Sequence, residues 1–405
     1  MKSIMRIIAP ALFALLSIAL SGMVAEAQDR VYVRAEPGTP VVAVQILVAV
    51  GPADEPAEQA GITYLTARSV VEPARALLDS LGAHLEVEQQ KDAVAFSLTA
   101  APDVWEEASR ALLVALFRDP VDSASVIRVR RALARELETR RQSPADALAR
   151  ELERAVYGEE HPWGRPSVGT PESVSRIGAG DVDAFLKGSF TPERSVVAVV
   201  GPVEAEAAVE RLATHMGEGA LRVTPPEAPR PAGEPVRTEY DAITTWVAAS
   251  WHFGADADVE ALRMLSKMAL QQVSFGPSRR SVYDSRADVV QYPGGGEVRL
   301  RVVVPPREAE QWAGRLREAV GGFAAQPLSG PVFSERLRRY RGERLLELDT
   351  PEARAAAMAR SALLGDPSAT LADFLGLSAA RLQRAAEGLE APVIVFLGPS
   401  EGEGA

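Results

Sequence analysis

The sequence contains no cysteine and only four histidines, and aromatic residues make up just 6% of its 405 positions. Without cysteine, the chain cannot form disulfides, use a thiolate nucleophile or build a cysteine-based zinc site. Its formal net charge is −11 at pH 7, and such an acidic chain is poorly suited to binding nucleic acid or anionic lipid. The 47% of hydrophobic and 24% of charged residues are the balance of a globular chain with a sizeable core.

The first 27 residues have the pattern of a secretory signal peptide. Two basic residues precede an apolar run at 7–20, and the triplet Ala-Glu-Ala at 25–27 presents small residues where a signal peptidase cleaves. An uncleaved membrane anchor is the alternative interpretation, but the run is short for a span and contains Pro10. We therefore expect secretion through a signal peptide at 1–27, with the periplasm as destination and no membrane insertion after cleavage.

The same order of sequence patterns occurs twice along the chain. A buried-strand pattern, a helical stretch, two alternating strand patterns, an Arg-rich helical segment and an apolar strand ending in Gly-Pro follow one another in each half. The matching segments are 41–50 and 245–253, 83–88 with 93–99 and 288–291 with 298–304, 126–141 and 334–348, and 195–202 and 392–399. This repeat predicts two homologous α+β domains. We expect the glycine run 294–296 to form a hairpin turn.

A proline-rich stretch separates the two halves. Residues 224–235 contain five prolines, which prevent a regular helix or strand ladder and favour an extended chain. The predicted organisation after the signal peptide is therefore an N-terminal domain at 28–222, a linker at 223–236 and a C-terminal domain at 237–405.

Three stretches keep the order and spacing of a known family. They are 43–61, 81–85 and 160–202, the last of which contains His-Pro-Trp-Gly and Gly-Thr-Pro-Glu-Ser. Together they resemble the pitrilysin and insulinase family of zinc peptidases, which includes the processing peptidases. The resemblance implies two mixed β-sheets flanked by helices and related by a pseudo-twofold axis. It also implies a chamber that encloses peptides between two such pairs of domains, of which this chain has the length of one.

The family's chemistry depends on a motif that this chain lacks. In His-x-x-Glu-His, two histidines one helical turn apart bind zinc, the glutamate activates the metal-bound water, and a glutamate on a later helix is the third ligand. By register, Tyr64, Ala67 and Arg68 replace the three motif residues. Tyrosine is a poor zinc ligand at neutral pH, alanine cannot accept a proton, and arginine is a permanent cation. Glu136 alone remains, at the position of the third ligand.

These four positions therefore form a degenerate metal site, and we predict no catalytic residue and no metal ligand in this chain. We expect Arg68 and Glu136 to form an ion pair where the metal would lie. The alternative is that they are two surface residues that do not touch. No substrate-binding residue can be assigned. The histidines have no paired spacing and are interpreted as structural; they are His84, His161, His215 and His252.

Three functions are compatible with these patterns. The first is a non-catalytic subunit that pairs with a homologous zinc peptidase bearing His-x-x-Glu-His and completes a chamber around a peptide or unfolded protein. Zinc is then expected only in the partner, and any proteolysis depends on that partner. The second is a standalone periplasmic scaffold of the same fold that binds peptides or proteins. The third is a metallopeptidase with a rearranged site, which requires stoichiometric zinc in the purified chain.

Overall fold

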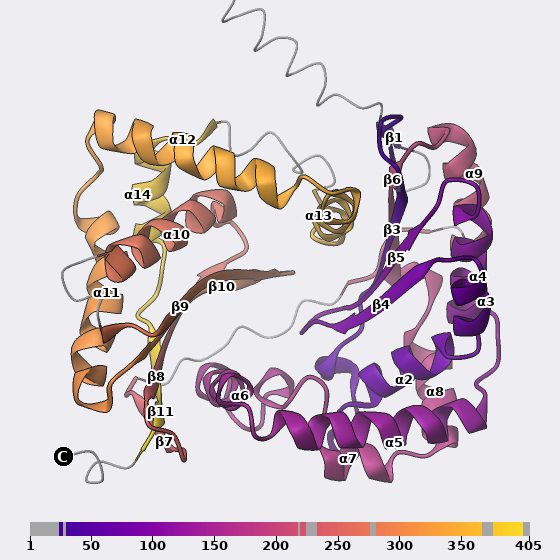
Figure 1. Cartoon of the computed structure of the whole chain (residues 1–405), viewed down its shortest axis with the longest axis horizontal. Helices are drawn as coiled ribbons and strands as arrows, with labels where there is room; N and C mark the ends of the chain where they lie inside the picture. Colours follow the sequence, from indigo (N-terminus) through magenta and orange to yellow (C-terminus); the bar gives the residue numbers. More distant parts are fainter. Residues whose placement is uncertain are drawn as a thin grey trace, which may run out of the picture.

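The computed structural model describes residues 24–26, 30–217, 219–223, 233–275, 281–366 and 376–399. Within these ranges the chain forms two β-sheets, each flanked by helices (Figure 1). The prediction of an α+β fold with two mixed sheets is confirmed. Most of the predicted signal peptide and of the predicted linker lies outside the described residues. Among the described residues, no helix has the length and apolarity needed to cross a membrane.

The first sheet has six strands in the order β1-β2-β6-β3-β5-β4. They are β1 Val24–Glu26, β2 Val31–Ala35, β3 Val42–Val48, β4 His84–Gln89, β5 Val94–Ala100 and β6 Ser195–Gly201. Strands β2 and β6 pair in parallel, whereas all other neighbours pair antiparallel. Strand β1 falls within the predicted signal peptide, and cleavage of that peptide stays a prediction.

The second sheet has five strands in the order β7-β11-β8-β10-β9. They are β7 Val236–Glu239, β8 Thr245–Gly254, β9 Asp284–Tyr292, β10 Gly295–Val304 and β11 Val393–Gly398. Again the first strand of the half pairs in parallel with the last, and the other neighbours are antiparallel. The order matches β2-β6-β3-β5-β4 strand for strand, so the repeat in the sequence corresponds to a repeated topology.

Helices connect and cover the strands. Those of the first half are α2 Ile62–Val71, α3 Arg75–Ser80, α4 Trp105–Phe117, α5 Ser123–Arg140, α6 Pro144–Tyr157, α7 Pro171–Arg176, α8 Ala179–Ser189 and α9 Ala205–Met216. Those of the second are α10 Val259–Phe275, α11 Ala309–Ala325, α12 Gly330–Glu347, α13 Pro351–Leu363 and α14 Ala379–Glu387. The side chains of Asp122, Ser143 and Thr350 accept hydrogen bonds from first-turn amides and so define where α5, α6 and α13 begin.

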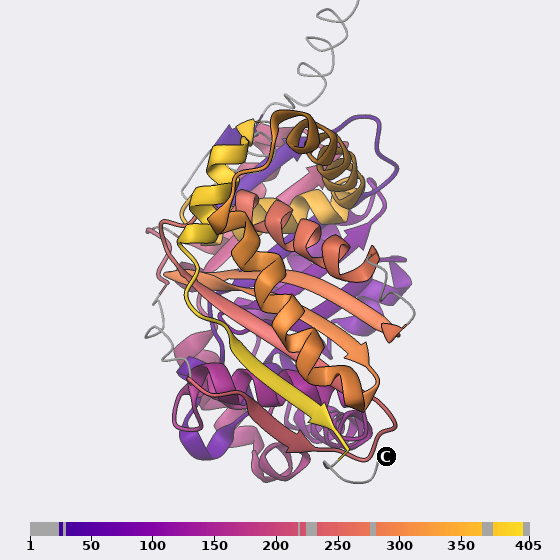
Figure 2. The same ribbon diagram turned by 90° about the vertical axis from the view of Figure 1, so that its left-hand side faces the viewer.

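One face of each sheet packs against the helices of its own half. Because side chains alternate along a strand, Val44 and Ile46 of β3 join the core formed with α2, α4 and α5, whereas Leu47 points to the opposite face. In the second half, α10 and α11 cover the corresponding face and lie in front of the strands in Figure 2. Burial of these apolar faces is the main stabilising contribution to each half.

The opposite face of each sheet is covered by a helix from the other half. Ala359 and Ala362 of α13 join a buried cluster with Leu47 and other residues of the first sheet. Leu148 of α6 joins a cluster with Val395 and other residues of the second sheet. Figure 1 shows α13 beside the first sheet and α6 beside the second. Because α6 and α13 hold the same place in the repeat, this exchange is symmetric and joins the halves through apolar contacts.

The glycine run in the β9–β10 hairpin corrects one prediction. The turn contains Pro293 and Gly294, whereas Gly295 and Gly296 already belong to β10. Gly294 has φ +92°, a left-handed conformation that favours glycine. A Cβ on Gly296 would lie 2.2 Å from the ring of Phe253, so close packing, and not the turn, requires glycine at that position.

Candidate functional site

The helix α2 carries the three positions of the substituted motif and is held at its start by backbone contacts. Gly61 has φ +91°, and a Cβ there would lie 2.6 Å from the carbonyl oxygen of Val168. The carboxylate of Glu55 accepts hydrogen bonds from the amides of Gly61 (2.9 Å) and Thr63 (3.0 Å). Burial raises the pKa of Glu55, although these amides favour its charged form. These contacts fix the rotation of α2 and hence the direction of its side chains.

Arg68 and Glu136 form an ion pair between α2 and α5. Nη1 of Arg68 lies 2.7 Å from Oε2 of Glu136, and the two side chains are 23% and 36% exposed. Arg140, one turn further along α5, places its Nε 3.6 Å from the other carboxylate oxygen. The predicted pair is therefore present, and Glu136 lies between two guanidinium groups.

The other two motif positions lie beside this pair. The hydroxyl of Tyr64 donates a long hydrogen bond of 3.5 Å to the carbonyl oxygen of Val87 in β4. Its ring centroid is 5.4 Å from the guanidinium carbon of Arg68, within the range of a cation–π contact. Ala67 is fully buried. The structure thus brings all four predicted positions together.

These side chains do not fit a zinc ion. Arg68 places a permanent cation at the position, and Glu136 is the only carboxylate of the four residues. The phenol of Tyr64 is directed to a backbone carbonyl. Within the part of the chain that the structure describes, no cluster of three or more histidine, aspartate or glutamate side chains is arranged to hold a metal.

The ion pair is expected to contribute little to stability. We expect Arg68→Ala and Glu136→Ala each to lower the free energy of unfolding by about 1 kcal/mol or less, because a partly exposed pair is well solvated. Urea denaturation of both single variants and of the double variant should give a coupling energy of about 0.5 kcal/mol. A coupling above about 2 kcal/mol would contradict this expectation and indicate a desolvated pair.

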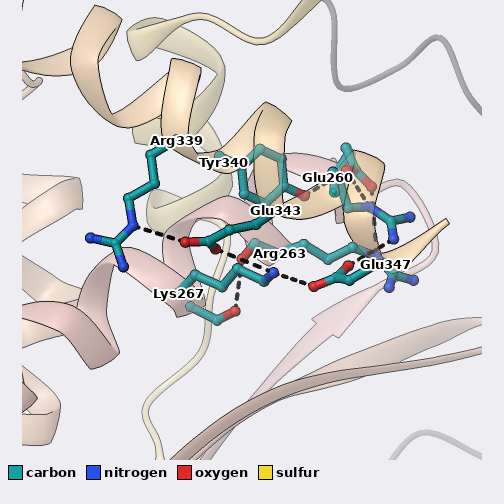
Figure 3. Close-up of polar contacts among 9 residues, drawn as sticks. Glu260, Arg263, Lys267, Arg339, Tyr340, Glu343 and Glu347 are labelled. Carbon is teal, nitrogen blue, oxygen red and sulfur yellow. Dashed lines mark hydrogen bonds and ion pairs between the residues drawn. The ribbon is translucent and has the colours of Figure 1, made fainter. Parts of the chain in front are cut away.

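The second half joins the equivalent helices by a larger polar network (Figure 3). Glu260 of α10 accepts hydrogen bonds from the hydroxyl of Tyr340 (2.5 Å) and from Nε of Arg344 (3.1 Å), both on α12. Lys267 of α10 pairs with Glu347 of α12. Because α10 and α12 repeat α2 and α5, both halves link the same helix pair through charged side chains. In the sequence, the only indication of this network was the Arg-rich helical segment at 334–348.

The histidines serve different roles. Nδ1 of His161 accepts a hydrogen bond of 3.1 Å from the amide of Trp163, and its ring stacks on Tyr157 at 5.2 Å. This is the structural role that we expected. His84 is 76% exposed on the edge strand β4, so its interpretation as a structural histidine is wrong: the alternation of β4 places it on the solvent side.

A buried polar cluster, which the sequence analysis missed, joins the two halves. Glu297 of β10 is 0% exposed. Arg299 donates two hydrogen bonds to its carboxylate, of 2.9 and 3.0 Å, and the hydroxyl of Ser250 donates a third of 2.7 Å. A fourth comes from the hydroxyl of Tyr157 on α6, in the first half. Burial alone would raise the pKa of Glu297, but Arg299, with Lys91 and Tyr157, lowers it to about 2.

Sequence comparison finds similar proteins in mycobacteria. The chain is 30% identical over 210 residues to an uncharacterized zinc protease of Mycobacterium tuberculosis. The matched region covers 48% of this chain and 46% of that protein. It is 28% identical over 203 residues to an uncharacterized zinc protease of Mycobacterium leprae, covering 48% and 45% of the two chains. These matches span about half the length of either relative. No protein-family model matches the chain.

Solved structures share the fold over almost the whole chain. An M16 peptidase inactive domain from Pseudomonas fluorescens superposes with a TM-score of 0.79 at 16% identity, covering 94% of this chain and 98% of that one. A protease from Helicobacter pylori superposes with a TM-score of 0.81 at 16% identity, covering 94% and 99%. At these identities the structures establish the fold. The chain therefore has the fold of these M16-type peptidase structures, and over about half of its length it is similar to the mycobacterial zinc proteases.

Proposed function

We propose that this chain is a non-catalytic subunit that pairs with a homologous zinc peptidase carrying His-x-x-Glu-His. The observation that carries the proposal is the 2.7 Å ion pair of Arg68 and Glu136, because a guanidinium stands where the family resemblance places a zinc ligand. Ala67 in addition removes the general base. The family fold is kept while its chemical groups are replaced, which favours a role in assembly and peptide binding over hydrolysis by this chain.

The proposed role is to supply one wall of a peptide-enclosing chamber. The resemblance implies a chamber of four domains, and this chain has two sheets. Strands β4 and β9 each lie at a sheet edge and pair on one side only among the described residues. Such edges can accept an extended peptide or an unfolded segment as an additional strand. The partner would hold the zinc ion and the general base, and the signal-peptide pattern supports assembly in the periplasm.

Co-purification from the native host tests the pairing. We expect the tagged chain, recovered under mild conditions, to co-elute in equal amounts with one homologue that bears His-x-x-Glu-His, because four domains are needed to close the chamber. Separation of the two by size exclusion should then abolish most peptide hydrolysis. We expect the active partner alone to retain about one tenth or less of the activity of the equimolar mixture.

Hydrolysis of a quenched fluorescent peptide measures this loss. The matched control is the partner mixed with an unrelated protein at the same concentration, which should behave as the partner alone. Full activity of the partner without this chain would contradict the proposal. So would recovery of this chain alone or with proteins of other folds.

A standalone binding scaffold is the second candidate function, and one observation favours it. Helices α6 and α13 each cover, within one chain, the sheet face that the helices of that sheet's own half leave open. The apolar residues on these faces are therefore buried without a partner. This function predicts a monomer or homodimer that binds peptides without cleaving them. Sedimentation of the purified chain, with and without peptide, distinguishes it from the heterodimer.

A further inference from the structure

A cavity of about 470 Å³ lies at the free edge of the second sheet. Its wall is formed by residues 286–290 of β9, by α10 and by α12, with Arg299 of β10. Among the described residues, β9 pairs only with β10, so its other backbone edge has no strand partner there. The cavity volume is in the range of small-ligand sites, and its length follows five consecutive residues of an extended strand.

Cations outnumber acids among the charged side chains that line this cavity. Five of its side chains are positively charged: Arg263, Lys267, Arg286, Arg299 and Arg344. Two are acidic, and both are already engaged. Asp288 accepts hydrogen bonds of 3.0 and 2.8 Å from Nε of Arg286, and Glu347 pairs with Lys267 and with Arg344. Carboxylates outside the lining also neutralise part of this charge, because Arg299 pairs with Glu297 and Arg344 with Glu260. The donors that remain for a ligand are those of Arg263 and Arg286.

Arg263 is the cation with the fewest partners. Among the described residues its guanidinium makes no hydrogen bond, and its contact with Glu260 is 3.7 Å long. Glu260 already accepts a hydrogen bond from Tyr340, as Figure 3 shows, and another from Arg344. Burial, and then the nearby Arg344, lower the pKa of Arg263, which means that its charge is destabilised where it stands. An anion beside Arg263 would relieve that cost.

Arg286 of β9 also lines the cavity and has donors that Asp288 does not use. Both of its hydrogen bonds to Asp288 come from Nε, so among the described residues its two terminal nitrogens make no hydrogen bond. A guanidinium binds a carboxylate best through two parallel N–H groups. Arg263 of α10 and Arg286 of β9 therefore both offer donors to the same space along a sheet edge.

We propose that this cavity binds the carboxylate of an acidic peptide that lies along β9. The choice of a peptide as ligand rests on the proposed function; the choice of an acidic one rests on the side chains described above. Strand addition would supply backbone hydrogen bonds, and the guanidinium groups would select aspartate, glutamate or a terminal carboxylate. Inorganic phosphate has the same charge chemistry but cannot pair with a strand edge, so it should bind more weakly.

Fluorescence anisotropy with the full chain tests this selection. The probe is a labelled peptide of about ten residues with alternating glutamates, and its matched control carries glutamine at those positions. We expect the acidic peptide to bind about tenfold more tightly or better, with an affinity that falls as salt is added. Arg263→Gln and Arg286→Gln should each reduce this affinity about fivefold or more. Arg307→Gln, on an exposed side chain outside the cavity, should leave it unchanged.

Three results would overturn the proposal. They are equal binding of the glutamate and glutamine peptides, unchanged affinity in Arg263→Gln when circular dichroism shows a folded variant, and displacement of the peptide by equimolar inorganic phosphate. The last would identify a small-anion site. The two proposals can fail independently. If the chain does not associate with the partner but still selects acidic peptides, the subunit role is excluded and the proposed ligand of the cavity stands.

Discussion

Replacing Glu297 with alanine is expected to lower the free energy of unfolding by about 3–5 kcal/mol, the cost of removing one partner from a buried ion pair. Its carboxylate is 0% exposed and accepts two hydrogen bonds from Arg299. The variant would leave this guanidinium buried without its carboxylate, and Tyr157 of the other half would lose its carboxylate acceptor and keep only the contact with the hydroxyl of Tyr292. Urea denaturation followed by far-ultraviolet circular dichroism measures the change.

Two controls separate burial from the loss of any ion pair. Asp183→Ala removes the partner of Lys187, an exposed contact of 2.6 Å within α8, and should change stability by about 0.5 kcal/mol or less. The double variant Glu297→Leu with Arg299→Leu removes both buried charges and should cost less than Glu297→Ala alone. A loss below about 1 kcal/mol in Glu297→Ala would mean that the cluster is hydrated and does not tie the halves together.

Acid titration gives a second measure of the same carboxylate. Its pKa is lowered from the ordinary 4.5 to about 2, so Glu297 stabilises the folded chain fully above pH 4.5. That contribution is lost as the pH falls toward 2, because the unfolded chain takes up the proton first. The expected loss is about 3 kcal/mol. The stability difference between the unaltered chain and Glu297→Ala should shrink over this pH range.

Rebuilding the metal motif is expected to create a zinc site where the ion pair now stands. The triple variant Tyr64→His, Ala67→Glu and Arg68→His restores His-x-x-Glu-His on α2. Two histidines one turn apart share a helix face, and Glu136 already lies within 2.7 Å of the Arg68 side chain. We expect about one zinc ion per chain after equilibrium dialysis, measured by mass spectrometry, because three protein ligands suffice for a catalytic type of site.

The third ligand provides the matched control. Adding Glu136→Gln to the triple variant should weaken zinc binding about tenfold or more, because a carboxylate ligand is replaced by a weakly coordinating amide. A folded triple variant that binds no more zinc than the unaltered chain would show that the register of α2 against the family motif is wrong. Stoichiometric zinc in the unaltered chain would instead favour the third function, a metallopeptidase with a rearranged site.

The repeat, the fold class and the degenerate motif were accessible from the sequence because each depends on local patterns. Strand and helix periodicity are properties of neighbouring residues, and the two halves show them in the same order. The positions of Tyr64, Ala67 and Arg68 follow from register along one helix. The partner of Arg68 was also predicted, since the resemblance supplied the matching position of Glu136.

Tertiary structure decided the features that depend on residues far apart in the chain. Strands β2 and β7 are short and were not predicted; they exist because each pairs in parallel with the last strand of its half. The exchange of α6 and α13, the burial of Glu297 and the cationic cavity at β9 likewise arise where separate segments meet. No local pattern distinguishes a glutamate that joins two halves from one that faces solvent, because the difference lies in which distant groups surround it.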